Sequence, residues 1–264
     1  MILMQTQNGD WYAVALGVRN IDGFNPLARE TFLIEVEFEN STPIFNPGHG
    51  IVLSEQKRPN LPWTPVAPEP TRDEFDSDEL AMKWYFVRIP KKKFHSLDDG
   101  KLTLSLQPEV IDSLTNSAMI IQKIKHHNFT AFTKLNFHTE KDNEQAGLVV
   151  YRTANGYYSL MKDKTGIVLT KKHLEEKEII RHIPYDKQEV YLKVFANGLD
   201  VNFSFGENPE KMTNIGGVQS LEVISDNRLN RFNGPGVGVY ATSNGLPSDN
   251  RASYDWFEYK NNND

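Results

Sequence analysis

The feature that most constrains the fold is a pair of alternating segments joined by Asn197-Gly198 within residues 189–205. Apolar residues occupy every second position on both sides of this dipeptide: Val190, Leu192, Val194 and Ala196 before it, and Leu199, Val201, Phe203 and Phe205 after it. A period of two places such side chains on one face of a strand, and Asn-Gly accepts the positive φ angles of a tight type I′ turn. Because an isolated hairpin is marginal in water, its apolar face has to pack against a second sheet.

Similar segments continue through the rest of the chain from about residue 73. They cover residues 82–88, 101–106, 119–123, 129–137, 146–151, 157–161, 167–170, 179–183, 220–224, 236–241 and 253–259. A second Asn-Gly pair, Asn155-Gly156, joins two of them. None shows a convincing long helical pattern. We therefore expect an all-β fold, with an antiparallel β-sandwich over residues 73–264.

Two further segments precede this sandwich. Residues 1–52 contain two or three strands by pattern, around residues 11–18 and 31–38. Because two or three strands cannot form an independent core, residues 1–52 need the rest of the chain or another chain to fold. Residues 53–72 contain five prolines, which predict an extended, semi-rigid linker on a surface.

The composition excludes several classes of function. A net charge of −6 without a dominant basic patch argues against a nucleic-acid partner. No apolar run is long enough for a membrane span, and Met1 to Gln5 lack the features of a signal peptide. The absence of cysteine excludes disulfides, thiolate metal sites and cysteine nucleophiles, and leaves the compartment open between cytoplasm and periplasm.

Acidic residues are candidates for a metal site, since the common phosphate, dinucleotide and nucleophile motifs do not occur. Asp73 and Glu74 begin the predicted sandwich, and Asp255 lies in its last strand. First and last strands often neighbour each other in such domains, and carboxylates brought together would repel unless a cation joined them. Oxygen ligands would suit a structural Ca²⁺. The alternative is that these are separate, solvated acids.

Aromatic side chains are candidates for sugar binding, because a flat ring can stack on the apolar face of a sugar. The candidates are Trp84, Tyr85, Tyr157, Tyr158, Phe232 and Trp256. We expect most of them in the core. Phe232 differs because it lies in Arg231-Phe232-Asn233-Gly234-Pro235, a loop pattern before a strand. A large apolar residue on a loop usually meets a partner.

Residues 5–12, 26–33 and 43–48 resemble the closing part of the catalytic propeller of glycoside hydrolase family 43, which contains β-xylosidases and arabinofuranosidases. Residues 73–76, 146–151 and 253–259 resemble the sandwich that follows it in the β-xylosidase branch. The resemblance covers nearly the whole chain. It implies a concanavalin A-like (jelly-roll) sandwich, preceded in residues 1–52 by a few strands of a five-bladed β-propeller.

The same resemblance implies a substrate-binding role and no catalytic residue for this chain. The family hydrolyses glycosides by inversion, with carboxylates that lie in earlier blades, upstream of anything present here. Arg29 matches the arginine that reaches the pocket centre, although Ala28 stands where glycine is usual. Phe232 matches the aromatic side chain that the sandwich inserts at the pocket rim. The implied ligands are xylo- or arabino-oligosaccharides from xylan and related plant cell-wall polymers.

Three hypotheses follow. The first is the C-terminal part of a family 43 glycosidase, inactive without an N-terminal propeller piece and prone to self-association through uncovered strands. The second is a stand-alone carbohydrate-binding module that uses Trp84, Tyr157 or Tyr158 as a stacking platform. The third is a structural accessory subunit that binds no sugar. Xyloside or arabinoside specificity, oligomeric state and compartment stay open.

Overall fold

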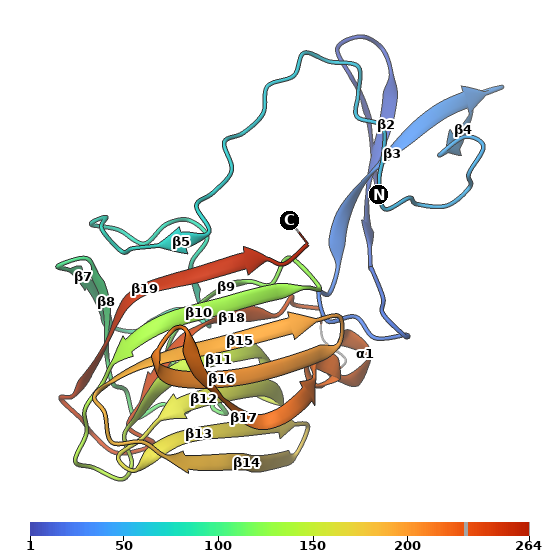
Figure 1. Cartoon of the computed structure of the whole chain (residues 1–264). Coiled ribbons are helices and arrows are strands. Elements are labelled where there is room, and N and C mark those ends of the chain that lie inside the picture. The colour runs from blue at the N-terminus through green and yellow to red at the C-terminus, as the bar shows by residue number, and fades with distance from the viewer. Residues whose placement is uncertain (230–231, 264) are drawn as a thin grey trace. The chain divides into compact units, whose positions relative to one another are not determined.

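The structure is a computed structural model that describes residues 1–229 and 232–263 (Figure 1). The chain divides into two compact units, and each contains residues that are not contiguous in the sequence. The first unit comprises residues 1–19 and 28–69, and the second comprises residues 20–27 and the chain from residue 70 onward. Within the described ranges, no helix combines the length and the apolar character that crossing a membrane would need.

The first unit is a four-stranded antiparallel sheet in the order β1-β2-β3-β4. Its strands are β1 (Ile2–Gln5), β2 (Trp11–Gly17), β3 (Glu30–Glu39) and β4 (Thr42–Phe45). Only Ala13, Ile34 and Val36 form a buried apolar cluster, whereas the side chains of Ile2 and Leu16 are about two-thirds exposed (67% and 66%). This sheet therefore has little core of its own. Residues 46–71, which the structure describes throughout, contain no strand.

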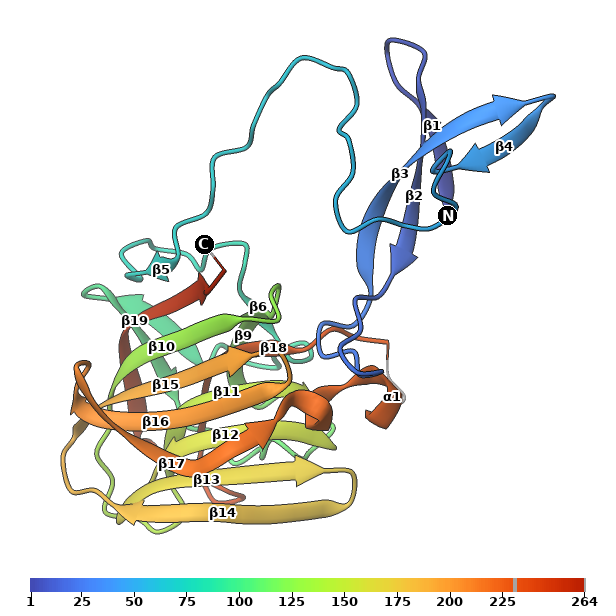
Figure 2. The same cartoon turned by 45° about the vertical axis from the view of Figure 1, so that its right-hand side comes forward.

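The second unit is built from two antiparallel sheets that form a sandwich (Figure 2). The eight-stranded sheet has the order β17-β16-β15-β10-β19-β8-β7, with β5 also paired to β19. Its strands are β5 (Arg72–Asp73), β7 (His95–Asp98), β8 (Lys101–Ser105), β10 (Phe129–Asn136), β15 (Glu189–Asn197), β16 (Asp200–Asn208), β17 (Lys211–Ser220) and β19 (Arg251–Asn261).

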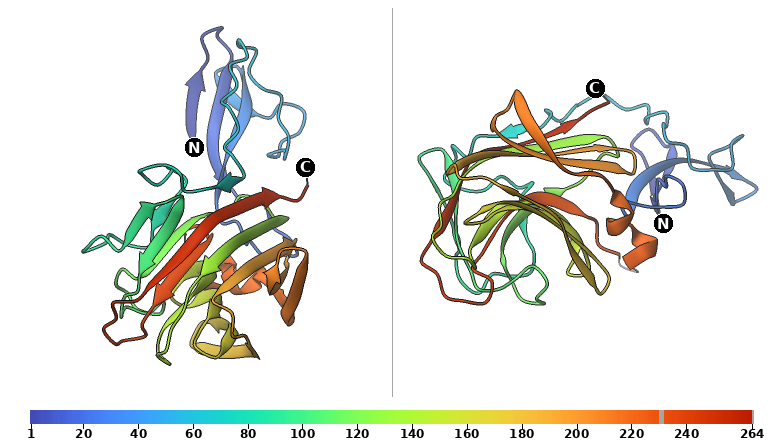
Figure 3. Two further views of the ribbon diagram at one scale, coloured as in Figure 1. Left: turned by 60° about the vertical axis from the view of Figure 1, so that its left-hand side comes forward. Right: turned by 60° about the horizontal axis from the view of Figure 1, so that its bottom comes forward.

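The seven-stranded sheet has the order β14-β13-β12-β11-β18-β9-β6. Its strands are β6 (Tyr85–Phe86), β9 (Ala118–Lys123), β11 (Gln145–Thr153), β12 (Gly156–Lys162), β13 (Gly166–His173), β14 (Glu176–Pro184) and β18 (Gly236–Thr242). The right-hand view of Figure 3 shows the two sheets as two layers. The alternating apolar side chains of both sheets meet between these layers in one large core.

The hairpin of β15 and β16 packs as its alternation predicts. Val194 and Ala196 on β15 and Val201 and Phe203 on β16 are fully buried. The turn differs from the expected type I′, however, because Asn197 pairs with Asp200 and the two turn residues are Gly198 and Leu199. Gly198 has a φ of +63° whereas Leu199 is not among the residues with positive φ. A positive φ at the first central position alone is the pattern of a type II′ turn.

Two predicted strands are wrong in part. Residues 220–224 form a 3₁₀ helix, η1 (Leu221–Ile224), in which the Ser220 hydroxyl accepts a hydrogen bond from the Glu222 N–H at 3.2 Å. The helix α1 (Asp226–Leu229) follows it directly. A short apolar run does not by itself distinguish a strand from a helical turn. Within residues 82–88, only β6 (Tyr85–Phe86) is a strand, and Arg88 after it adopts a left-handed φ of +68°.

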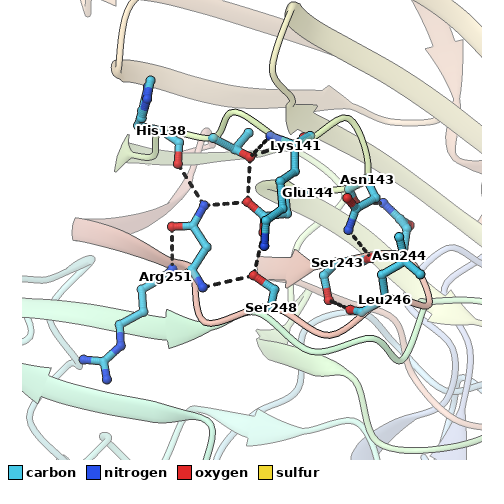
Figure 4. Close-up of polar contacts among 11 residues, drawn as sticks. His138, Lys141, Asn143, Glu144, Ser243, Asn244, Leu246, Ser248 and Arg251 are labelled. Carbon is cyan, nitrogen blue, oxygen red and sulfur yellow. Dashed lines mark hydrogen bonds and ion pairs between the residues drawn. The ribbon is translucent and has the colours of Figure 1, made fainter.

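A buried carboxylate ties together two loops at one end of the sandwich (Figure 4). Glu144, only 1% exposed, accepts hydrogen bonds from Ser248 Oγ (2.6 Å), Thr139 Oγ1 (2.6 Å) and Asn250 Nδ2 (2.7 Å). Lys141 Nζ lies 3.3 Å from its Oε1. Burial alone raises the pKa of Glu144, but these donors outweigh it and lower the pKa from 4.5 to about 2. The side chain is therefore a buried, fully satisfied anion.

Candidate functional site

Arg29 lies in the first unit, immediately before β3, and its residue is exposed. The preceding Ala28 is completely buried and has a left-handed φ of +65°. This conformation favours glycine, which is the residue usual at this position in the resembling family. On the other side, Glu30 accepts two hydrogen bonds from Arg19, from Nη2 at 2.6 Å and from Nε at 2.9 Å. The backbone around Arg29 is thus defined on both sides.

Residues 20–27, which lead directly to Ala28, belong to the second unit. The Asn25 N–H donates to Ser225 Oγ at 2.8 Å, and Asn227 Nδ2 donates to the Gly23 carbonyl at 2.8 Å. The buried Arg152 donates to the Ile224 carbonyl at 2.7 Å. Pattern along the sequence contains no sign of this anchoring, because residues 23 and 25 lie about 200 positions from their partners Asn227 and Ser225.

Phe232 lies in the second unit, on the loop between α1 and β18, and its side chain is 77% exposed. The residues that follow it are held by hydrogen bonds. Asn233 Nδ2 donates to the Arg152 carbonyl at 2.6 Å, and Lys123 Nζ donates to the Gly234 carbonyl at 3.3 Å. Arg231, which is part of the predicted loop pattern, lies outside the described residues. The geometry presents an apolar ring to solvent from a tethered loop.

Two of the three carboxylates of the predicted cation site lie on neighbouring strands, Asp73 on β5 and Asp255 on β19, and Glu74 follows β5 directly; the pairing of β5 with β19 confirms that the first and last strands are adjacent. Asp73 Oδ2 accepts from Trp84 Nε1 at 2.8 Å, while Asp255 is ion-paired with Lys134 Nζ (2.9 Å) and Lys101 Nζ (3.3 Å). Glu74 Oε1 lies 3.8 Å from an Arg72 nitrogen.

Across the described residues, no group of three or more His, Cys, Asp or Glu side chains is placed to hold a metal. Because Asp255 already has two lysine partners, the arrangement favours the alternative of separate acids. Ca²⁺ binding by Asp73, Glu74 and Asp255 stays a prediction.

The predicted stacking platform on Trp84, Tyr157 and Tyr158 is wrong, because these rings are only 7%, 0% and 1% exposed. Trp84 packs edge-on against Phe257 at 5.1 Å between centroids, and Tyr158 packs against Phe203 at 5.1 Å. These large apolar rings contribute more when buried in the core than when exposed.

Partly exposed rings occur instead on the outer face of the eight-stranded sheet. Phe132 lies 5.1 Å from Trp256 and 5.9 Å from Tyr191, measured between ring centroids. The guanidinium of Arg72 covers the Trp256 ring at 3.9 Å. Sequence reasoning named Trp256 but missed the other two rings. Their positions in the alternating pattern of the strands could have revealed them. Phe132, for example, follows the buried Ala131 and therefore points to the opposite, outer face.

Residues 72–260 match the family described as the beta xylosidase C-terminal concanavalin A-like domain of GH43. The chain belongs to this family. The predicted concanavalin A-like sandwich and the resemblance to family 43 are thereby confirmed. The matched region begins at β5, the first strand of the second unit, and ends within β19.

Comparison with whole proteins extends the similarity to both units. The chain is 31% identical to a non-reducing end alpha-L-arabinofuranosidase of Bacteroides ovatus over 98% of this chain and 50% of the relative. It is 32% identical to a xylosidase/arabinosidase of Butyrivibrio fibrisolvens over 97% of this chain and 51% of the relative. The crystal structure of a xylan beta-1,4-xylosidase from Bacillus halodurans superposes with a TM-score of 0.90 at 26% identity, covering 98% of this chain and 52% of the enzyme. The chain thus spans about half the length of the curated relatives it matches.

Proposed function

We propose that this chain is the C-terminal half of a family 43 glycosidase that removes xylosyl or arabinosyl units from short plant cell-wall oligosaccharides. In this proposal the chain supplies substrate contacts and the supporting sandwich. The catalytic acid and base belong to the propeller half that the relatives possess in addition, so the chain alone does not hydrolyse glycosides.

One observation carries the proposal: both units of the chain, and not the sandwich alone, match one half of xylosidases and arabinosidases. The sheet of the first unit also presents apolar side chains outward, among them Ile2 and Leu16, which are 67% and 66% exposed and lie on one face by the pairing of β1 with β2. A sheet face of this kind needs a covering partner. A propeller half would cover it. Without one, we expect self-association, and monomeric behaviour at high concentration in a sizing experiment would count against this exposure.

Arg29 and Phe232 are the residues to which we assign sugar contacts. An exposed guanidinium can donate several hydrogen bonds to sugar hydroxyls and pair with carboxylates. An exposed phenyl ring can pack on the apolar face of a sugar. Both side chains have the required character, since both residues are exposed and Phe232 precedes a stretch of loop that the Asn233 hydrogen bond tethers.

The test is hydrolysis of p-nitrophenyl xyloside and p-nitrophenyl arabinofuranoside by a mixture of this chain and the separately expressed other half of the Bacteroides ovatus relative. We expect Arg29→Ala to lower kcat/KM by about thirtyfold, from the loss of about 2 kcal/mol of charged hydrogen bonding. Phe232→Ala should lower it by about tenfold, from the loss of ring packing.

Matched controls come from elsewhere on the chain. Phe195, on β15, is 41% exposed, and Arg181, on β14, is also exposed. Phe195→Ala and Arg181→Ala should leave kcat/KM unchanged. Equal losses in the controls and in the two test variants would mean that the effects report on folding rather than on sugar contact.

Carbohydrate binding by the sandwich alone is the second candidate, and the outward-facing rings of Phe132, Tyr191 and Trp256 favour it. Neighbouring rings on a sheet face can contact successive sugar units, even though Arg72 covers one face of the Trp256 ring. Retardation of the chain in a gel containing soluble xylan, lost in Trp256→Ala but kept in Trp63→Ala, would support it. Trp63 is the control because its ring is 68% exposed outside the sandwich. No retardation would favour the structural role.

A further inference from the structure

A cavity of about 470 Å³ lies on the face of the seven-stranded sheet that points away from the main core. Ile121 on β9 and Tyr151 on β11 line it, whereas their neighbours Ile120 and Val150 point into the core. The volume falls in the range of small-molecule sites and suits a monosaccharide. All of its described lining residues belong to the second unit.

Two aromatic rings and a hydroxyl without a hydrogen-bond partner in the described chain line this cavity. Tyr85 on β6 and Tyr151 line it, and burial is the main cause that raises the pKa of both phenols. Both phenols are therefore neutral donors at ordinary pH. The Tyr85 hydroxyl is buried and has no hydrogen-bond partner among the described residues. A Cβ at Gly236 would lie 2.6 Å from this oxygen, so the glycine provides the space that the hydroxyl occupies. A buried donor without a partner is costly unless a ligand satisfies it.

Positively charged side chains line the same cavity next to these rings. Lys123 Nζ contacts the Gly234 carbonyl at 3.3 Å and lies 5.1 Å from the Tyr85 ring centroid, but no carboxylate of a described residue lies within ion-pair distance of it. Burial, and then the charge of Arg152, lower the pKa of the Lys123 ammonium. Lys123 and Arg88 are exposed residues, so their charges are solvated in the free protein, and a carboxylate in the cavity would gain ion pairs with them without competition from an acidic residue in the described lining.

Arg88 adds a second cation to the lining from a strained backbone. Its φ is +68°, and Asn116 Nδ2 holds this conformation by donating to the carbonyls of Val87 at 3.0 Å and Arg88 at 3.2 Å. None of the described lining residues is Asp or Glu, although the chain as a whole has six more acidic than basic residues. The lining of the cavity is therefore positively charged, whereas the net charge of the whole chain is negative.

We infer that this cavity binds a uronic acid, with its carboxylate paired to Lys123 and Arg88 and its ring packed against Tyr85 and Tyr151. A neutral pentose would not pair with the two cations, and a small inorganic anion would not cover the two rings. The proposed ligand contacts neither Arg29 nor Phe232, although Lys123 also holds the Gly234 carbonyl in the loop that carries Phe232. The ligand's source is either a free uronic acid or a uronate unit attached to an oligosaccharide.

Calorimetric titration of the full chain with methyl glucuronide tests this inference, with methyl xyloside as the neutral sugar and acetate as the carboxylate without a ring. We expect binding of methyl glucuronide only. Lys123→Met should weaken it about tenfold or more, since it removes a charged hydrogen-bond donor. Tyr85→Phe removes only the hydroxyl that has no partner among the described residues, and it should weaken the binding of methyl glucuronide several-fold. This second variant keeps the test decisive if Lys123→Met does not fold.

Lys162→Met is the matched control, because Lys162 is also a lysine of lowered pKa beside a ring, with Nζ 5.8 Å from the Tyr185 centroid, outside the cavity. It should bind methyl glucuronide as the wild type does. Equal affinity for methyl xyloside or for acetate would overturn the assignment, as would undiminished binding by folded Lys123→Met. A glucuronic-acid-substituted xylo-oligosaccharide that binds more tightly than methyl glucuronide would identify the attached form as the ligand; equal affinity would identify the free sugar.

Discussion

Replacing Glu144 with glutamine should destabilise the sandwich in a manner that depends on pH. In the native protein the carboxylate is 1% exposed, accepts three short hydrogen bonds and lies 3.3 Å from the Lys141 ammonium (Figure 4). Glutamine keeps the size of the side chain but removes its charge. The glutamine amide nitrogen is also a hydrogen-bond donor, and it would face the hydroxyl and amide groups that donate to the carboxylate in the native protein.

The magnitude follows from the pKa. A pKa lowered from 4.5 to about 2 corresponds to about 3 kcal/mol of folding free energy, at about 1.4 kcal/mol per pH unit. Because the folded-state pKa is the lower one, this stabilisation is fully present above pH 4.5 and is lost as the pH falls to about 2. The free-energy difference between wild type and Glu144→Gln should therefore be about 3 kcal/mol at pH 7 and should vanish near pH 2.

Urea unfolding of both proteins, followed by near-UV circular dichroism at a series of pH values, measures this difference. The control is Glu140→Gln in the same loop, because the Glu140 side chain is 80% exposed and its ion pair with His138 is a surface contact. Glu140→Gln should match the wild type throughout. A difference for Glu144→Gln that stays constant between pH 5 and pH 2.5 would refute the reasoning, since it would then arise from packing and not from the charge.

Three further predictions concern other parts of the sandwich. Tyr254→Phe removes a buried hydroxyl that lies 3.0 Å from each of two backbone carbonyls, and should lower the free energy of unfolding in urea by about 1 kcal/mol. Gly198→Ala adds a Cβ whose nearest neighbour is Ile21 Cδ1 at 3.9 Å, an ordinary contact, so its cost of about 1 kcal/mol comes from the φ of +63°. Gly147→Ala places its Cβ 2.1 Å from the Leu160 carbonyl oxygen and should prevent a stable fold; comparable melting temperatures for the two variants would contradict this. The predicted Ca²⁺ site would raise the melting temperature when Ca²⁺ is added, and Asp255→Asn would abolish the rise; unchanged melting with Ca²⁺ and with chelator would instead support separate, lysine-paired acids.

The sandwich was largely predictable because its strands alternate with a period of two. Strand β19 and the hairpin of β15 and β16 were recognised in this way, and their inward-facing residues are buried. Strand β17 was missed because Gly216 and Gly217 interrupt its alternation. Both have positive φ, and the pairing register with β16 shifts beside them. Local pattern contains no signal for such an irregular strand.

The candidate sites were less predictable, because their residues are distant in sequence. Arg29 and Phe232 were identified only through the resemblance to a family. The hydrogen-bond donors to Glu144 come from two loops about 100 residues apart in the sequence. Lys123 and Tyr85 line one cavity from separate strands. The buried Trp84 shows the opposite failure: a residue type suited to sugar binding proved to be part of the core. Residue type alone does not reveal exposure.

The measurement that tests the central claim most directly is glycoside hydrolysis by the purified chain, alone and after addition of the other half of the Bacteroides ovatus relative. The substrates are p-nitrophenyl xyloside and p-nitrophenyl arabinofuranoside. We predict that the chain alone is inactive and that the mixture is active, because general acid and base groups are supplied only by the added half. Hydrolysis by the chain alone would contradict the claim that its residues bind sugar without providing the catalytic carboxylates.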